Sequence, residues 1–515
     1  MLPPFKNEPF TNFNDPANKA AFEQALALVE SRFGEKIPLI IDGERIFTDD
    51  TIKSTNPANP DQVLAYVGKG TQELALKALD LANKNFQWWK NYDPDARARI
   101  LLRAAAILRR RKHEFSATMV FEIGKNWNEA DGDTAEAIDF LEFYAREMMR
   151  LNERQPVTEF PGEENNLYYI PLGVGAVIPP WNFPGAIMAG MTTASLVTGN
   201  TVILKPASIT PVIAYRFMEI LEEAGLPAGI VNYLPGPGGA IGDTIVDHKL
   251  TRFIAFTGSM EIGQRIFQRA PIVHEGQLWL KRTVLEMGGK DAILVDDDAD
   301  IEFAAEQIVT AAFGFQGQKC SACSRLIVHE KVYDKLLELV VNRTKQIKTG
   351  PTRDLSNWHG PVSDEGAYNK ILEYIEIGKS EGRLVAGGNR GGFPGYFIEP
   401  TIIADVAPHA RIMQEEIFGP VLAVCKVNSF EEGLEVFNST QFGLTGGYFG
   451  KRREHLEKVR VHAHCGNLYL NRKCTGALVG VQPFGGFNQS GTDSKAGGRD
   501  YLQLFLQGKS VTERF

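Results

Sequence analysis

Residues 173–225 read GVGAVIPPWNFPGAIMAGMTTASLVTGNTVILKPASITPVIAYRFMEILEEAG, and this stretch decides the fold. It contains two short apolar runs, GVGAVIPP and TVILKP, and each is followed by a segment with helical periodicity. The same order, a short apolar run and then a helical segment, repeats in residues 230–247 and again in residues 252–270. Four consecutive units of this kind predict a mostly parallel sheet with helices packed on its faces. The chain is therefore predicted to be an α/β protein.

The segments on either side extend this prediction. Residues 1–37 are expected to form an N-terminal arm with helical periodicity, and Asp42-Gly43 is a turn signal for a hairpin. Residues 71–150 have amphipathic helical patterns. The residues expected to cap these helices at their N-termini are Thr71, Asp93 and Asp133. The alternation of strands and helices then restarts, which predicts a second α/β domain from residue 288.

Length and composition restrict the class of protein. The chain has 515 residues, which is too long for a single hydrophobic core. A net charge of −8 leaves no basic surplus, so no nucleic acid partner is expected. Neither a signal-like start nor an apolar run of about 18 residues is found, so we expect neither secretion nor contact with a membrane. Five cysteines in such a chain fit reduced thiols in the cytoplasm better than a disulfide framework.

Two of these cysteines, Cys320 and Cys323, form a C-x-x-C arrangement in FGFQGQKCSACSR. Such a pair can be a dithiol redox site, half of a zinc site, or a nucleophile with a bystander. Zinc needs a second ligand pair, and the group of His462, His464 and Cys465 has the wrong spacing. A thioredoxin-like pair is expected near the start of a small domain. We therefore favour a single catalytic thiolate and expect no metal.

Two candidate cofactor contacts follow predicted strands. Gly258-Ser259-x-x-x-Gly263 opens a predicted helix, whose free N–H groups suit a pyrophosphate, although many such turns carry Gly and Ser for conformational reasons only. Lys205 ends the strand TVILKP at the sheet edge where open α/β sheets bind ligands. Taken by itself, Lys205 fits a solvated lysine at a strand end better than a ribose or phosphate contact.

Three further polar residues stand in rigid or apolar surroundings. Asn182 lies in IPPWNFPG, a loop whose backbone is fixed by prolines. Its side-chain amide can donate a hydrogen bond to a developing oxyanion. The alternative is a hydrogen bond to its own backbone. Glu286 ends a predicted apolar strand. Apolar neighbours raise the pKa of a carboxyl group, which suits a general base. The alternative is a solvated carboxylate at the edge of the strand. Glu416 is a candidate for a ribose contact or an ordinary acidic loop residue.

The joint occurrence of seven motifs in this order resembles the aldehyde dehydrogenase superfamily. The resemblance covers roughly residues 38–510 and rests on PWNFP at 180–184, KPA at 205–207, FTGS at 256–259, LEMGGK at 285–290, GQKC at 317–320, EEIFGP at 415–420 and PFGG at 483–486. It implies a Rossmann-type NAD-binding domain, an α/β catalytic domain and a small β oligomerisation flap.

The resemblance also implies a mechanism and its residues. Cys320 is the implied nucleophile, Glu286 the base that activates water, and Asn182 with the Cys320 backbone N–H the oxyanion donors. The residues implied to contact the cofactor are Pro180, Trp181, Lys205, Ser208, Gly258, Ser259, Gly263, Glu416 and Phe418. Many members carry Glu where this chain has Ser208, and that Glu binds the adenine ribose. Without it a 2′-phosphate is not repelled, so NAD is expected and NADP stays open.

Within the superfamily, KCSACSR, TAEAIDF and TGALVGVQPFGGFNQSGTDSKAGG resemble the branch that oxidises L-glutamate γ-semialdehyde, the open form of pyrroline-5-carboxylate. In that branch the loop 475–480 binds the amino-acid end of the substrate. The residues implied to contact the substrate are Ser321, Gly476, Ala477, Phe183, Phe484 and Glu136. For Glu136 an exposed helical carboxylate is the equal alternative, and Ala477 replaces a frequent serine. The product, glutamate, implies a role in proline or arginine breakdown.

Three rival functions stay open at this point: oxidation of another semialdehyde or aliphatic aldehyde, a CoA-acylating activity, and a catalytically silent binding protein. Glu286 speaks against the second rival, and the retained Cys320, Glu286 and Asn182 speak against the third.

The expected division of the chain is residues 1–37 as the arm, 38–152 and 172–287 as the NAD-binding domain, and 288–490 as the catalytic domain. Residues 153–171 and 491–515 are expected to be oligomerisation segments in a homo-oligomer built on a domain-swapped-like dimer. The apolar-alternating tail LQLFLQGKSVTERF is expected to be a strand that pairs with a partner subunit or joins its own sheet.

Overall fold

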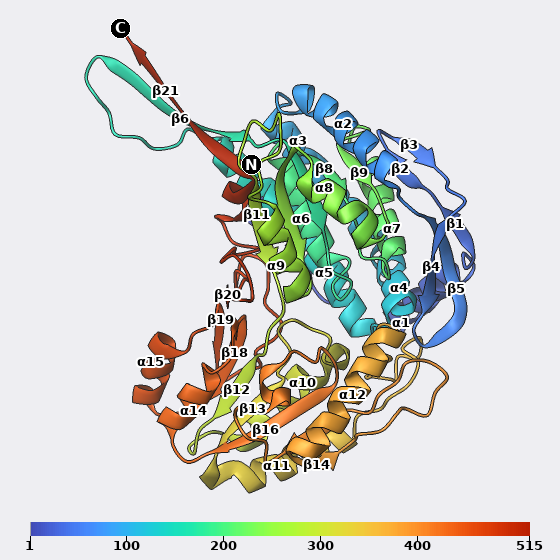
Figure 1. The fold of residues 1–515 in the computed structure, drawn as a ribbon, viewed down its shortest axis with the longest axis vertical. Coiled ribbons are helices and arrows are strands. Elements are labelled where there is room, and N and C mark those ends of the chain that lie inside the picture. Colours follow the sequence, from blue (N-terminus) through green and yellow to red (C-terminus); the bar gives the residue numbers. More distant parts are fainter. Residues whose placement is uncertain (1) are drawn as a thin grey trace.

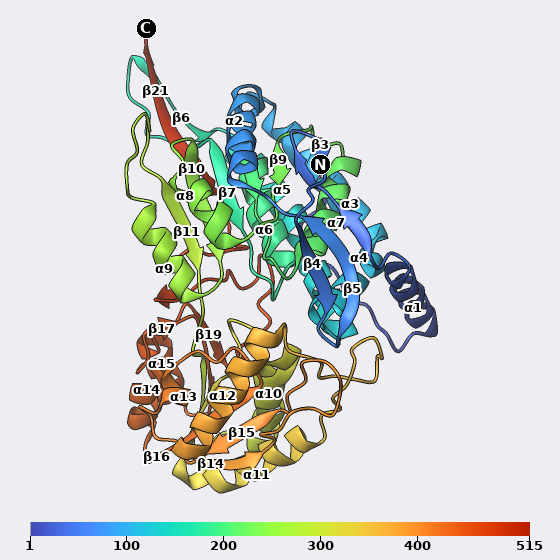
Figure 2. The ribbon, with the colours of Figure 1, turned by 45° about the vertical axis from the view of Figure 1, so that its right-hand side comes forward.

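The computed structural model describes residues 2–515, and two seven-stranded sheets dominate it (Figures 1 and 2). In the first sheet the strand order is β11-β10-β7-β8-β9-β2-β3. Its strands are β2 (Leu39–Ile41), β3 (Glu44–Ile46), β7 (Val174–Ile178), β8 (Thr201–Leu204), β9 (Val231–Tyr233), β10 (Thr251–Thr257) and β11 (Arg282–Glu286). The five strands from β7 to β11 are parallel, and β2 and β3 are antiparallel. The predicted mostly parallel sheet is confirmed.

The helices predicted to follow these strands are present as α6 (Ala186–Val197), α7 (Pro211–Glu223), α8 (Asp243–Asp247) and α9 (Met260–Arg269). A π-helical turn, Gly238–Gly242, leads into α8. The hairpin predicted at Asp42-Gly43 joins β2 to β3, and both residues have positive φ angles, 54° and 81°. This conformation is what a two-residue hairpin turn requires.

Four long helices form the predicted helical region: α2 (Gln72–Trp89), α3 (Pro94–Arg110), α4 (Lys112–Ile123) and α5 (Trp127–Asn152). The caps predicted at Thr71 and Asp93 are confirmed, because their side chains accept N–H groups of Leu74 and Ala96 at 3.3 and 2.9 Å. The cap predicted at Asp133 is wrong. Helix α5 begins six residues earlier in the sequence, at Trp127, and the side chain of Asn126 caps it.

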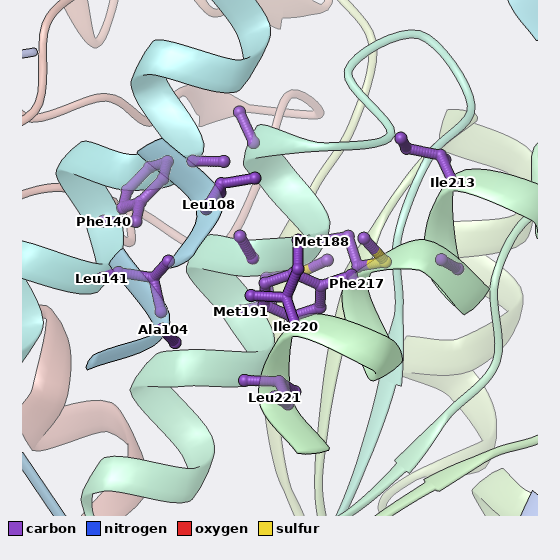
Figure 3. Close-up of a cluster of buried hydrophobic side chains, with 14 of the residues drawn as sticks. Ala104, Leu108, Phe140, Leu141, Met188, Met191, Ile213, Phe217, Ile220 and Leu221 are labelled. Carbon is purple, nitrogen blue, oxygen red and sulfur yellow. The ribbon is translucent and has the colours of Figure 1, made fainter. Parts of the chain in front are cut away.

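Asp133 instead caps a different helix. Its carboxylate accepts the N–H of Ala186, the first residue of α6, at 2.5 Å. Helices α3, α5, α6 and α7 pack their apolar faces together, and Figure 3 shows the shared core, with side chains such as Leu108, Phe140, Met188 and Phe217.

The N-terminal arm is packed against the body of the protein. Helix α1 (Pro16–Glu30) buries Phe22 against Trp127, with ring centroids 4.4 Å apart. A separate three-stranded sheet follows α1 in the sequence. Its strands are β1 (Glu35–Ile37), β4 (Thr51–Asn56) and β5 (Asn59–Gly68).

The second large sheet has the strand order β14-β15-β16-β13-β12-β18-β19 and is parallel except for β14. Its strands are β12 (Ala292–Val295), β13 (Arg325–His329), β14 (Arg383–Ala386), β15 (Thr401–Ala404), β16 (Val421–Val427), β18 (Thr445–Phe449) and β19 (Asn467–Leu470). The helices beside it are α10 (Ile301–Phe313), α11 (Glu330–Lys345), α12 (Glu365–Glu381), α13 (Arg411–Gln414), α14 (Phe430–Phe437) and α15 (Arg453–His462).

The C-terminal tail forms a two-stranded ribbon that projects from the body (Figures 1 and 2). Strand β21 (Leu506–Arg514) pairs antiparallel with β6 (Glu163–Pro171). The tail therefore adds to neither large sheet of its own chain, because β6 supplies the edge it pairs with. A second small pair, β17 (Phe442–Gly443) with β20 (Phe487–Asn488), lies near the junction of the two sheets. Across residues 2–515, no helix combines the length and apolar character needed to span a membrane.

Candidate active site

A cavity of about 540 Å³ lies where residues of both halves of the protein meet. Cys320 and Glu286 line it, together with all six residues implied to contact the substrate: Glu136, Phe183, Ser321, Gly476, Ala477 and Phe484. These eight residues come from segments up to 348 positions apart, from Glu136 to Phe484. The sequence-based candidates for nucleophile, base and substrate contacts thus share one chamber.

Cys320 follows α10 and a short 3-10 turn, Gly314–Gly317. Helix α10 ends at Phe313, because Phe315 and Gln316 adopt left-handed φ angles of 48° and 57°. Burial raises the pKa of the Cys320 thiol, and the neighbouring carboxylates of Asp291, Glu286 and Glu416 raise it further. The chain by itself therefore holds Cys320 as a neutral thiol.

Asn182 is buried, and its amide donates to the carbonyl of Gln318 at 3.2 Å. This contact holds the proline-rich loop against the segment that carries Cys320. An amide nitrogen has two N–H donors, so the second remains free to serve another acceptor. Asn182 is not among the residues that line the cavity, but its partner Gln318 is two positions from Cys320 in the sequence.

Glu286 is the last residue of β11, as predicted, and it is not a solvated strand-edge carboxylate. Burial raises its pKa to about 8, although hydrogen bonds from the Ser494 hydroxyl and the Gly486 N–H, the latter at 3.4 Å, act in the opposite direction. A carboxyl group with this pKa exchanges protons near neutral pH, which suits a general base.

Cys323 is buried and packs away from the cavity. Its thiol faces the carbonyl of Arg325 at 3.5 Å and lies beside Cys474. All five cysteines, Cys320, Cys323, Cys425, Cys465 and Cys474, are free thiols in the structure. These contacts fit the packing role of a bystander better than a redox pair.

Glu136 faces the cavity from α5, so the alternative of an exposed helical carboxylate is wrong. Burial raises its pKa to about 8, and Asp133 adds to the effect. Glu136 follows Asp133 by three positions and Glu129 by seven, and all three line the cavity. The face of α5 that points into the cavity is therefore acidic.

The sequence analysis missed three lysines that surround this acidic face. Lys319 pairs with Glu129 at 2.7 Å, and Lys125 pairs with Asp133 at 3.0 Å. The Lys125 ammonium also lies 3.9 Å from the centre of the Phe183 ring. Lys473 lines the cavity beside them. The one available signal was the position of Lys319, directly before the candidate nucleophile.

The loop 475–480 also contributes to the wall of the cavity, through Thr475, Gly476, Ala477 and Leu478. Gly476 has a φ angle of 78°, a left-handed conformation that glycine adopts without strain. The guanidinium of Arg472 donates to the carbonyls of Thr475 and Gly476 at 3.0 and 3.1 Å. Among the described contacts, the N–H groups of Gly476 and Ala477 have no acceptor. Adjacent free N–H groups of this kind bind anions.

Most of the residues implied to contact the cofactor follow strands of the first sheet, whereas Glu416 and Phe418 lie between α13 and β16 in the second half of the protein. Lys205 is 6% exposed as a whole residue, its ammonium has no hydrogen bond or ion pair among residues 2–515, and burial lowers its pKa to about 8. Ser259 caps α9, and Ser208 is exposed. A largely buried cation without a partner at the carboxyl end of a strand fits an anionic or hydroxyl-bearing group such as a dinucleotide.

Other residues of this set have local packing roles. A Cβ on Gly263 would lie 2.3 Å from the sulfur of Met287, so its glycine lets α9 pack closely on the chain after β11. A Cβ on Gly258 would lie 2.5 Å from the Phe256 ring. Phe418 packs edge-on against Trp181, with centroids 5.4 Å apart, next to the buried Pro180. Glu416 accepts the N–H of Gly289 at 2.9 Å.

Comparisons with known proteins agree with this arrangement. The aldehyde dehydrogenase family matches residues 46–511. The chain is 61% identical over 515 residues to a 1-pyrroline-5-carboxylate dehydrogenase of Geobacillus sp. (strain WCH70), covering 100% of both chains. A solved 1-pyrroline-5-carboxylate dehydrogenase from Thermus with bound NAD has a TM-score of 0.98 and 50% identity, again covering 100% of both chains.

A more distant structure, betaine aldehyde dehydrogenase from Staphylococcus aureus in complex with NAD+, has a TM-score of 0.88 at 28% identity and covers 96% of this chain and 97% of that one. The fold therefore agrees with that of solved members of the matched family over nearly the whole sequence. The chain belongs to the aldehyde dehydrogenase family.

Proposed function

We propose that this protein oxidises L-glutamate γ-semialdehyde to L-glutamate with NAD as hydride acceptor. The observation that carries the proposal is the cavity itself. It has a thiol and a carboxyl group of raised pKa for the chemistry, and Glu136 and the N–H groups of the loop 475–480 for an amino acid. Relatives of 61% and 50% identity, both named 1-pyrroline-5-carboxylate dehydrogenase, support the same substrate.

The reaction begins at Cys320. Its thiol gives up a proton, and the sulfur attacks the aldehyde carbon to form a thiohemiacetal. The Asn182 amide and the Cys320 backbone N–H stabilise the oxyanion. A bound nicotinamide supplies the acceptor for the hydride that leaves this carbon, and a thioester on Cys320 remains. Because burial and three carboxylates raise the pKa of Cys320, thiolate formation needs a base or a compensating positive charge at the moment of attack.

Glu286 completes the turnover. Its carboxylate removes a proton from a water molecule, which attacks the thioester carbon, and the Cys320 sulfur leaves as the thiolate. One aldehyde, one NAD+ and one water thus give one carboxylic acid, one NADH and one proton. The presence of Glu286 in the cavity favours this hydrolysis over transfer of the acyl group to CoA.

The same cavity distinguishes the two ends of the substrate. We assign the α-carboxylate to the N–H groups of Gly476 and Ala477 with the Ser321 hydroxyl, and the α-ammonium to Glu136. Phe183 and Phe484 enclose the aliphatic middle. Ala477 lacks the hydroxyl of a serine, but its backbone donor is unaffected.

The cofactor would be held by the carboxyl edge of the first sheet. Lys205 and the N-terminal end of α9, with Gly258, Ser259 and Gly263, would bind its phosphate and ribose groups, and Glu416 the second ribose. Pro180, Trp181 and Phe418 would pack beside it. A solved relative with bound NAD supports NAD as the preferred cofactor. Ser208 offers no carboxylate that would repel a 2′-phosphate, so we infer that NADP is tolerated.

We also propose the division into domains at residues 38–152 with 172–287 and 288–490, and a homo-oligomer in which residues 153–171 and 491–515 contact another subunit. The ribbon of β6 and β21 supports this, because Tyr168 and Val511 are 51% and 38% exposed on it. Five free thiols support a cytoplasmic location.

The decisive experiment compares kcat/KM for L-glutamate γ-semialdehyde and for propanal, with NAD and with NADP. The proposal predicts that glutamate semialdehyde with NAD gives the highest value, because propanal has neither the carboxylate nor the ammonium that the cavity addresses. A preference for propanal would reject the substrate, and equal values with the two cofactors would reject the NAD preference.

A further inference from the structure

The segment that precedes α1 forms part of the wall of the substrate cavity. The backbone N–H and the hydroxyl of Thr11 donate to Asp131 at 2.7 and 2.5 Å, and the N–H of Glu8 donates to Asp139 at 2.6 Å. Asp131 and Asp139 both line the cavity from α5. Phe10 lines it too, although 65% of its side chain is exposed, which places this ring at the mouth.

One residue of this segment reaches across the cavity wall to the loop 475–480. The amide nitrogen of Asn7 donates to the carboxylate of Asp139 at 2.8 Å and to the carbonyl of Val479 at 3.0 Å. Both of its N–H groups are therefore engaged. Asn7 connects α5, which carries Glu136, to the loop that carries Gly476 and Ala477.

The loop is packed into the protein through the buried Val479 and through Gly480, where a Cβ would lie 3.0 Å from Phe143 of α5, but few hydrogen bonds fix its backbone. Arg472 and Gln482, which lie next to it in the sequence, hydrogen-bond to its backbone, and the N–H of Gly480 donates to the carbonyl of Gly497 at 2.9 Å. Among residues 2–515, Asn7 is the only side chain from outside 472–482 that hydrogen-bonds to the backbone of this loop.

An aromatic contact adds to this hydrogen bond. The ring of Phe5 lies 3.3 Å from the position that a Cβ on Gly480 would take, and it packs edge-on against Phe143 of α5, with centroids 5.2 Å apart. The segment before α1 therefore touches the loop twice, through a hydrogen bond and through an aromatic ring.

We propose that Asn7 is a positioning residue for substrate binding: it fixes the distance between Glu136 on α5 and the anion-binding N–H groups of Gly476 and Ala477. This inference rests on the proposed function, since it assigns the loop to the α-carboxylate of the substrate. A zwitterionic substrate must engage both groups at once, so a shift of the loop weakens its binding. An aldehyde without these charges does not use the loop.

The test is Asn7→Ala in the full-length protein. A misplaced loop loses about one charge-assisted hydrogen bond to the carboxylate, which corresponds to a roughly tenfold change in affinity. KM for glutamate semialdehyde is expected to rise about tenfold and the inhibition constant of L-glutamate to rise in parallel, with kcat within about twofold of wild type. kcat/KM for propanal is expected to stay unchanged.

Two further variants make the result specific. Asn7→Asp keeps the size of the side chain but has no N–H donor at neutral pH, so its KM is expected to rise at least as much. Asn18→Ala is the matched control, because that amide donates to the carbonyl of Asn12, away from the cavity, at 3.1 Å. Its kinetics are expected to match wild type.

The outcomes separate this inference from the proposed function. Wild type that does not oxidise glutamate semialdehyde rejects both. If the wild-type protein oxidises glutamate semialdehyde but Asn7→Ala and Asn7→Asp have the same KM as wild type, only the positioning role is rejected. Equal losses on glutamate semialdehyde and propanal also reject it, because they would show a general structural role. Thermal unfolding of each variant identifies a folding defect. If Asn7→Ala has such a defect, the KM of Asn7→Asp for glutamate semialdehyde decides whether Asn7 positions the loop.

Discussion

The pH at which Glu286 becomes a base depends on one hydroxyl group. The Ser494 hydroxyl donates to this carboxylate, and the contact stabilises its ionised form against burial, which raises its pKa to about 8. Ser494→Ala removes the hydrogen bond while the Gly486 N–H, at 3.4 Å, remains. The pKa of Glu286 is therefore expected to rise further in the variant.

The size of the shift follows from the strength of the lost bond. A hydrogen bond to a charged group contributes about 1.5 kcal/mol at the low end of its range, and about 1.4 kcal/mol corresponds to one pKa unit. The pKa of Glu286 thus moves from about 8 to roughly 9. At pH 7 the ionised fraction falls from about one in eleven to about one in a hundred, so hydrolysis of the thioester slows roughly ninefold.

The assay measures kcat against pH with saturating NAD and propanal, which has no amino group that cyclises with its aldehyde. The base acts only when ionised, so the rate is lost as the pH falls through the pKa, and the acid limb of Ser494→Ala should lie about one unit above that of wild type. In stopped flow, the first turnover of NADH formation should keep its wild-type amplitude, because Glu286 acts after the hydride has left.

A matched control comes from the same loop. Thr492→Ala removes a hydroxyl that accepts the backbone N–H of Leu285 at 3.0 Å and does not touch the Glu286 carboxylate. Its acid limb should coincide with that of wild type. Coincident limbs for wild type and Ser494→Ala would refute the reasoning, and so would equal shifts in both variants.

Three other substitutions have expected outcomes. Glu136→Gln should lower kcat/KM for glutamate semialdehyde about tenfold and leave propanal unaffected, because it removes one charge-assisted contact to the ammonium; steady-state kinetics with both substrates check this. Lys205→Met should weaken NAD binding about tenfold or more in a fluorescence titration without lowering the thermal midpoint, because this buried ammonium has no partner among residues 2–515. Gly263→Ala should destabilise the fold by about 1–3 kcal/mol in urea unfolding, because its Cβ would meet Met287 at 2.3 Å, and Met287→Ala should relieve this loss.

Local patterns predicted much of the fold. The alternation from residue 173 onward indicated the parallel sheet, and Thr71, Asp93 and Asp42-Gly43 have the capping and turn roles that their chemistry predicts. The prediction that Asp133 caps its own helix is wrong because the N–H group it accepts belongs to another helix. The local sequence around an aspartate does not show whether it caps the helix that follows or a distant one. The contact to Ala186 spans 53 residues, and no local pattern contains it.

The functional site likewise combines residues that local motifs predict with contacts that no local motif contains. Cys320, Glu286 and Asn182 stand in motifs that are recognisable along the chain, and they lie in or beside the cavity. The ion pair of Lys319 with Glu129 spans 190 residues, and the pairing of β21 with β6 joins Leu506 to Pro171, 335 positions apart. Such contacts depend on how the two halves of the protein meet, so they became visible only in the structure.

The most direct test of the central claim is to trap the intermediate on Cys320. Glu286→Gln removes the base for hydrolysis, so after mixing with glutamate semialdehyde and NAD, an acid quench and peptide mass spectrometry should find a glutamyl thioester on Cys320, formed together with one NADH per active site. An unmodified Cys320 alongside NADH formation, or an acyl group on Cys323 instead, would contradict the account.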